Sequence, residues 1–250
     1  MQKSIILLIF ITLCLVSSAQ DLTPSGVLYA SGETHIAEVK LQADLSDDSL
    51  ATERIYNLTD NDWNSYGVVK IGNQYWMAEN LKTTKFNDGT TIPVISDYNE
   101  WSSLVSPGYC LYNNDSGKYK SKYGLLYNGY TVSTGKLCPI GWHVPSEEEW
   151  AVLINYCGKK IAGGNLKERY NWMSPNTGAT NATGFTALPG GSRGNLGSFM
   201  DAGIRGHWWS STENNNTDVW NGTMSYSGST VNGGSDHKKS GLSVRCMKDN

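Results

Sequence analysis

The cysteines of this chain constrain its fold most, because exported proteins use cysteines as disulfides whereas cytosolic proteins keep them reduced. The chain opens with Lys3, an apolar run at 5–16 and small residues at 17–19, which is the pattern of a secretory signal peptide cleaved after Ala19. The apolar run is too short for a stable membrane anchor. We therefore expect a secreted or cell-surface protein with no transmembrane segment after cleavage.

Four cysteines follow the predicted signal peptide: Cys110, Cys138, Cys157 and Cys246. An even number in an exported chain favours disulfides, and four cysteines allow three ways of pairing. The sequence has no CxxC or HExxH motif, and its four histidines are scattered. We therefore expect no zinc site and predict no cofactor.

The composition points to short strands and many turns. The chain has 27 glycines, 14 tyrosines and 9 tryptophans but only 4 phenylalanines, which suits polar loops around a core of large aromatic residues. Residues 20–60 hold few aromatic residues and no cysteine, so we assign them to a tail or linker and place the domain at 61–250. The net charge of −3, without a basic stripe, argues against nucleic acid as a partner.

The stretch CPIGWHVPSEEEW predicts the start of a helix. Ser146 is a favourable N-cap, and Glu149, three residues later, completes a capping box. Glu147 and Glu148 then fall in the first turn, where the helix dipole favours negative charge. The apolar positions that follow share one helical face: Trp150, Leu153, Ile154 and Cys157. The glutamates are therefore expected to be structural rather than catalytic, and Gly158 is expected to end the helix.

Strands are predicted elsewhere from apolar runs and alternation. Two apolar-rich runs flank Gly72 and predict a hairpin with a tight turn. In GHWWSST, a regular strand would turn one of Trp208 and Trp209 away from the core. VWNGTMSYS alternates between an apolar face, with Trp220 in the core, and a polar face. GLSVRCMK predicts a C-terminal strand whose inward residues are Leu242, Val244 and Cys246.

Several motifs occur in one order from about residue 60 to the end of the chain. They are VKIGNQYWMAENLKTTKFNDGTTIP, YGLLYNGYTV, LCPIGWHVPSEEEW, GGNLKE, SPNTGATNATGFTALPGGSR, WWSST and SVRCMKD. Together they resemble the Fibrobacter succinogenes major paralogous domain, a family of exported bacterial proteins. The tail before residue 60 is not covered by this resemblance.

The resemblance implies a fold similar to the C-type-lectin-like group, which includes the formylglycine-generating enzymes. The implied fold class is α+β, with short antiparallel strands, one or two helices and long irregular loops. In this group the first helix is stapled to the last strand, which here implies a Cys138–Cys246 disulfide. Cys110 and Cys157 either pair or remain buried thiols, and we favour thiols. The resemblance implies no established activity.

We expect a binding module that recognises glycans or polysaccharides, because proteins on this scaffold often bind through loops after the helix. Amide, acidic and aromatic side chains suit sugar hydroxyls and ring faces. The candidate residues are Arg193, Asn195, Trp208, Asn214, Asn216 and Asp218. Asparagine is also common in loops for purely conformational reasons. A calcium-bridged sugar site is not expected, because VWNGT has Gly222 where lectins carry an acid.

Two alternatives differ from glycan binding. A structural or assembly component of the cell surface would contact another protein through Asn221, Thr223 and Ser225 on the polar face of the VWNGTMSYS strand. An enzyme related to the formylglycine-generating proteins would need a reactive cysteine pair late in the chain, where this sequence has only Cys246 after Cys157. We therefore predict that the protein is not an enzyme.

Overall fold

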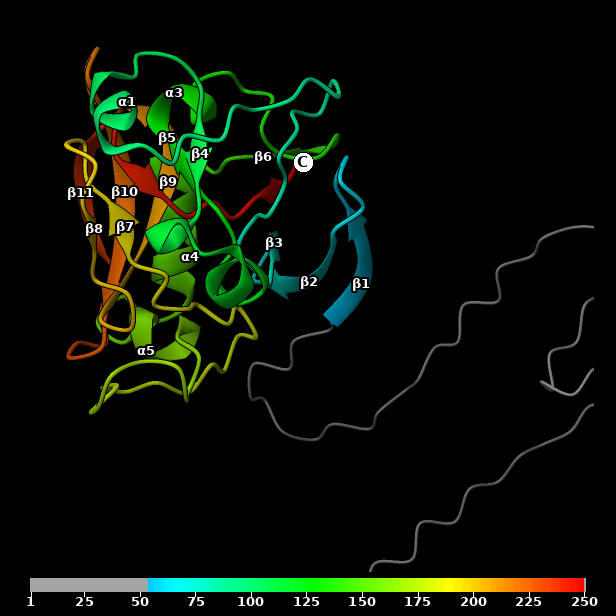
Figure 1. Ribbon diagram of the computed structural model, residues 1–250. Helices are drawn as coiled ribbons and strands as arrows, with labels where there is room; N and C mark the ends of the chain where they lie inside the picture. The colour runs from blue at the N-terminus through cyan, green and yellow to red at the C-terminus, as the bar shows by residue number, and fades with distance from the viewer. Residues whose placement is uncertain (1–53, 250) are drawn as a thin grey trace, which may run out of the picture. The chain divides into compact units, whose positions relative to one another are not determined.

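A computed structural model describes residues 54–249 of the chain (Figure 1). These residues form a mixed α+β domain that is rich in short strands, and all pairs of named strands are antiparallel. The α+β class is thus confirmed. The predicted signal peptide at 1–19 and most of the predicted tail lie outside the described residues.

The first sheet has the strand order β1-β2-β3-β13-β6. Its hairpin β2–β3 turns at Gly72, as predicted, and the φ of 61° there lies in the left-handed region that glycine adopts without strain. β1 precedes residue 61, so the sheet includes residues that we had assigned to a tail or linker. The strand bounds are β1 Arg54–Thr59, β2 Ser65–Ile71, β3 Gln74–Met77, β6 Trp142–His143 and β13 Met247–Lys248.

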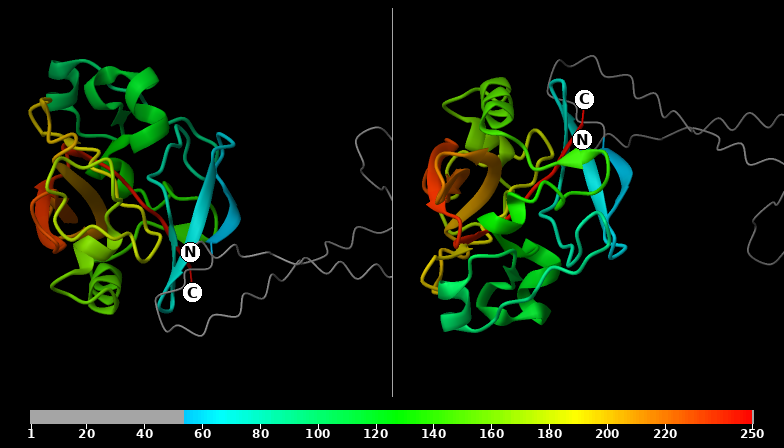
Figure 2. Two further views of the ribbon diagram at one scale, coloured as in Figure 1. Left: turned by 90° about the horizontal axis from the view of Figure 1, so that it is seen from below. Right: turned by 90° about the horizontal axis from the view of Figure 1, so that it is seen from above.

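The two other sheets carry the second half of the chain. One has the order β11-β10-β9 and the other β4-β5-β12-β7-β8. The sheet of β9, β10 and β11 lies on the opposite side of the described domain from the β1–β2 hairpin (Figures 1 and 2). Its strands are β9 Arg205–Glu213, β10 Asp218–Ser225 and β11 Asn232–His237. Those of the third sheet are β4 Tyr109–Cys110, β5 Leu126–Asn128, β7 Ser192–Arg193, β8 Phe199–Met200 and β12 Gly241–Leu242.

The described residues contain more helices than the one or two expected, but most are a single turn. They are α1 Tyr98–Ser103, α2 Ser121–Tyr123, α3 Gly129–Val132, α4 Glu147–Tyr156 and α5 Ala162–Leu166. A 3-10 turn at Tyr112–Asn114 and a π-helical turn at Ser116–Lys120 lead into α2. The short helices replace part of what we expected to be irregular loop.

The helix α4 begins as the sequence predicts. Ser146 Oγ accepts a hydrogen bond from the Glu149 amide, and the Glu149 carboxylate accepts one from the Ser146 amide. Trp150 and Leu153 are buried on the predicted apolar face. The Trp150 ring packs 5.1 Å from that of Trp76 and 6.4 Å from that of Trp220, so α4 joins the first sheet to β10 through aromatic contacts.

Strand β9 lies between two hydrophobic clusters, and this corrects the expectation for its tryptophans. Trp208 belongs to the cluster around Trp76 and Trp150, while Trp209 belongs to the cluster around the disulfide. Both side chains are fully buried. Neither tryptophan faces away from the core, because the domain packs hydrophobic side chains against both faces of this strand.

The C-terminal segment is not the single strand that we predicted. Its residues 243–246 lie between β12, which belongs to the third sheet, and β13, which belongs to the first. Leu242, Val244 and Cys246 are buried as expected, but Ser243 and Arg245 are buried as well. The segment therefore crosses the core between two sheets, where it has no solvent-facing side.

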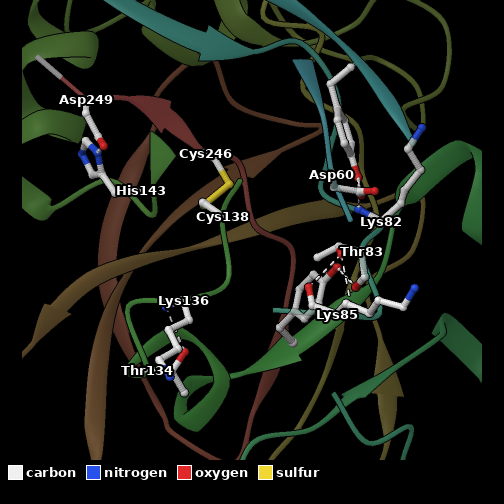
Figure 3. Close-up of a disulfide and its surroundings, with 12 residues drawn as sticks. Asp60, Lys82, Thr83, Lys85, Thr134, Lys136, Cys138, His143, Cys246 and Asp249 are labelled. Atoms are coloured by element: carbon white, nitrogen blue, oxygen red, sulfur yellow. Dashed lines mark hydrogen bonds and ion pairs between the residues drawn. A yellow bond between two sulfur atoms is a disulfide. The ribbon is translucent and has the colours of Figure 1, made fainter. Parts of the chain in front are cut away.

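The described residues contain one disulfide, which joins Cys138 to Cys246 (Figure 3). This is the pair that the family resemblance implies, and it links the segment before α4 to the C-terminal segment. Cys110 and Cys157 are free and buried. Within the described part of the chain, no helix is both long enough and apolar enough to cross a membrane.

Candidate functional site

The structure does not bring the six predicted binding residues together, and two of them are interior residues. Arg193 is 1% exposed, and its guanidinium donates to the carbonyl oxygens of Ile95 at 2.7 Å, Ser96 at 3.1 Å and Asp97 at 3.0 Å. Trp208 is 0% exposed and donates from Nε1 to Asn80 Oδ1 at 2.9 Å. Contrary to the prediction, these two side chains hold the interior together.

The other four predicted residues occupy two separate turns. Asn195 is exposed in the connection between β7 and β8. Asn214 and Asn216 are exposed between β9 and β10, and Asp218 is half-buried at the start of β10. The Asp218 carboxylate accepts a hydrogen bond from Asn215 Nδ2 at 2.9 Å. Internal hydrogen bonds thus explain part of this turn, and a ligand role for these residues stays a prediction.

The polar face of β10 is largely occupied by internal partners. Asn221 is 3% exposed and donates to Asp236 Oδ2 at 3.1 Å. Thr223 donates to Asn221 Oδ1 at 3.1 Å and contacts His207 Nδ1 at 3.0 Å. Of the three residues proposed for protein contacts, Asn221 is therefore not available at the surface, while Thr223 and Ser225 are half-buried.

The cysteines within residues 54–249 are either bonded or buried. Cys246 is bonded to Cys138, and burial raises the pKa of both Cys110 and Cys157 to about 12, so these thiols stay protonated. No group of histidine, cysteine and acidic side chains among residues 54–249 is placed to hold a metal ion.

A different segment, SGKYKSKY at 116–123, brings three lysines and two tyrosines together at the surface. Asp115 precedes it and accepts a hydrogen bond from the Lys118 amide at 3.0 Å, which caps the π-helical turn. Helical spacing places residues four apart on one face. The rings of Tyr119 and Tyr123 accordingly stack, with centroids 6.0 Å apart and an interplanar angle of 26°. π-helical turns of this kind are frequent at functional sites.

The stacked pair continues an aromatic row. The Tyr112 ring lies 5.0 Å from that of Tyr119 and 5.3 Å from that of Phe199 on β8. Tyr119 and Tyr123 are half-buried, and neither hydroxyl forms a hydrogen bond within residues 54–249. These contacts hold the ring planes of Tyr119 and Tyr123 in place, and the two hydroxyls can bind an outside partner.

A cleft of about 240 Å³ opens beside this row, and we call it the tyrosine cleft. The Lys118 ammonium lies 5.2 Å from the centre of the Tyr119 ring, and the Lys122 ammonium lies 5.0 Å from that of Tyr123. These distances are within cation–π range. The lining residues are Lys118, Tyr119, Lys122, Tyr123, Ala202 and Gly203.

A second cleft of about 380 Å³ lies on the other side of the same segment, and we call it the serine cleft. Lys82 and Lys120 are its basic groups. Trp63 directly precedes the lining residue Asn64, is 86% exposed and has a φ of 62°, which is unusual for a tryptophan. The lining residues are Asn64, Lys82, Ser116, Gly117, Lys120 and Ser121.

The sequence carries one local signal for this site. Lysine and tyrosine fall close together in SGKYKSKY, although the whole chain is slightly acidic and showed no basic stripe. The clefts themselves were not predictable, because Lys82 and Ala202 reach the segment only through the folding of distant parts of the chain.

These features define a disulfide-linked α+β domain with two basic clefts and an aromatic row at its surface. The model of the Fibrobacter succinogenes major domain matches residues 69–248, and the chain belongs to this family. No curated protein matches the chain. No solved structure matches it either.

Proposed function

We propose that the protein is an exported binding module that recognises glycans through the tyrosine cleft. The observation that carries this proposal is the stacked pair of Tyr119 and Tyr123, which presents two aromatic rings and their hydroxyls at a cleft. Sugar rings have an apolar face that packs on aromatic rings, and hydroxyls that pair with polar groups at the rim.

Three further observations support the proposal. The apolar run at 5–16 followed by small residues indicates export. The Cys138–Cys246 bond suits an oxidising compartment and is the staple expected of a C-type-lectin-like fold, which we propose for this domain. The two other cysteines among residues 54–249 are buried thiols with raised pKa values, which speaks against cysteine-based catalysis at these positions.

A polysaccharide retention assay with the full chain tests this function. The protein is passed over immobilised neutral and charged polysaccharides, and bound protein is measured for the wild type and for Tyr119→Ala, Tyr123→Ala and Tyr170→Ala. Tyr170 is 84% exposed and lines neither cleft, so it is the matched control.

We expect retention on at least one polysaccharide, with loss in the two cleft variants and no loss in the control. Thermal melting checks that the variants are folded, and Tyr123→Phe separates the ring from its hydroxyl. If the folded wild type is retained on no glycan, the proposal fails and an assembly role through protein contacts becomes the better hypothesis. Equal weakening by Tyr170→Ala would show that the cleft is not the site.

A further inference from the structure

We propose that the glycan bound by this module is anionic, and that it contacts the tyrosine cleft and the serine cleft together. This inference rests on the proposed glycan-binding function and adds the charge of the ligand and the extent of the site. It is carried by four lysines, two in each cleft: Lys82, Lys118, Lys120 and Lys122.

The lysines lack the partners that usually neutralise surface charge. None of the four forms an ion pair within residues 54–249, whereas Lys85, Lys136 and Lys238 each pair with a carboxylate. No aspartate or glutamate lines either cleft. Positive charge is therefore concentrated here on a chain whose net charge is −3.

The acidic side chain nearest in sequence, Asp115, directly precedes Ser116 and accepts a hydrogen bond from the Lys118 amide at 3.0 Å. Other nearby acidic side chains are engaged in contacts with residues other than the four lysines. Asp62 lies 3.3 Å from the Lys85 ammonium, and Asp201, which precedes the lining residue Ala202, lies 3.2 Å from the Arg205 guanidinium. Asp60 accepts hydrogen bonds from the Tyr66 hydroxyl at 2.5 Å and from Asn64 Nδ2 at 2.8 Å. The cleft lysines thus keep their charge available for an outside anion.

The placement of the lysines along the segment suits a chain-like ligand. Lys118 and Lys122 line one cleft, and Lys120, between them in sequence, lines the other. A lysine ammonium is a mobile point charge that donates hydrogen bonds to carboxylate or sulfate oxygens in several directions. A polysaccharide with acidic units would therefore stack on Tyr119 and Tyr123 and place successive anionic groups on both sides of the segment.

The test compares two ligands with the same sugar backbone, of which one is charged and the other is neutral. Binding of the full chain to polygalacturonate is measured by isothermal titration calorimetry, beside fully methyl-esterified polygalacturonate, in which the carboxylates are neutral. We expect affinity at least about tenfold lower for the ester, which corresponds to about 1.4 kcal/mol. Dextran sulfate distinguishes sulfate from carboxylate as the preferred anion, and binding to either anionic glycan in preference to its neutral form supports the inference.

Double lysine variants test which lysines bind the anionic groups of the glycan. Lys118→Gln/Lys122→Gln removes the lysines of the tyrosine cleft, and Lys82→Gln/Lys120→Gln removes those of the serine cleft. Lys159→Gln/Lys160→Gln removes the same charge from exposed positions outside both clefts. We expect each cleft pair to weaken binding of the anionic glycan about tenfold or more, and the control pair to leave it within about twofold.

The possible outcomes separate the two proposals. Equal affinity for the acid and its ester overturns the anionic inference while glycan binding stands. Equal loss in the control pair, or equal affinity for polyglutamate or single-stranded DNA, also overturns it, because charge alone would then explain binding. Failure to bind any glycan overturns the proposed function itself.

Discussion

His143 Nδ1 lies 2.6 Å from Oδ1 of Asp249, so this histidine holds the C-terminal end of the described chain (Figure 3). Its other ring nitrogen, Nε2, lies 3.0 Å from both carboxylate oxygens of Glu149. Glu149 is also the residue that caps α4. One imidazole thus connects the residue that follows β13 to the first turn of α4.

This contact predicts a pH dependence of stability. Burial lowers the pKa of His143, but the carboxylates of Asp249 and Glu149 raise it by more, so that it lies above its ordinary value of 6.5. A histidine with a raised folded pKa stabilises the fold fully below pH 6.5, and this contribution is lost as the pH rises through the folded pKa.

We therefore expect the free energy of unfolding to fall as the pH rises above 6.5, and this fall to be absent in His143→Gln. Urea denaturation at a series of pH values measures it. His237→Gln is the control, since His237 contacts neither carboxylate. If the free energy of unfolding of His143→Gln falls with pH as steeply as that of the wild type, the contacts of His143 with Asp249 and Glu149 do not cause the pH dependence.

The helix α4 was predictable from the sequence because its signals are local. Ser146 and Glu149 are three residues apart, and the capping box needs no other part of the chain. Trp208 and Trp209 could not be assigned correctly, because the alternation of a strand does not reveal that hydrophobic clusters cover both faces. Arg193 was predicted to be a surface ligand group, but its guanidinium donates to three carbonyls that are distant in sequence and to the nearby Gly197 carbonyl. Contacts with distant parts of the chain cannot be predicted from the local sequence.

The disulfide predicts that the cysteine variants differ in how much stability they lose. Cys138 and Cys246 are 108 residues apart, and in the chain-entropy model a loop of that length stabilises by roughly 4–5 kcal/mol. We expect Cys138→Ser/Cys246→Ser to destabilise the domain by several times more than Cys157→Ala, which removes one buried thiol. Urea denaturation under non-reducing conditions gives both values. Non-reducing peptide mapping that linked Cys138 to Cys110 or Cys157 would contradict the pairing.

The contacts of the buried Lys167 ammonium predict that its removal lowers the stability of the domain. Its ammonium donates to the carbonyl oxygens of Thr177 at 3.1 Å, Ser225 at 2.9 Å and Gly228 at 2.8 Å. Lys167→Met keeps an unbranched side chain that is one atom shorter but leaves these acceptors without their donor, so we expect a loss of about 1–3 kcal/mol. Lys159→Met, at an exposed position, should change stability by less than about 0.5 kcal/mol. Equal values for the two variants would show that the three contacts contribute nothing.

The last prediction concerns where the folded domain begins. β1 pairs with β2 from Arg54 to Thr59, and Asp60, which follows, accepts hydrogen bonds from the amides of Asp62 and Asn64. A chain that begins at residue 61 loses the strand and these acceptors together, and it leaves β2 as an unpaired edge, which favours association between chains.

We therefore expect a chain beginning at residue 54 to melt cooperatively at nearly the temperature of the full chain, and one beginning at residue 61 to melt lower and to associate. Calorimetry and light scattering measure the two effects. Asp60→Asn in the full chain separates the carboxylate from the strand, because it keeps β1 while weakening the acceptor of the Tyr66 hydroxyl. If the chain from residue 61 melts like the full chain and stays monomeric, β1 adds nothing to the fold, and the boundary inferred from the sequence is the correct one.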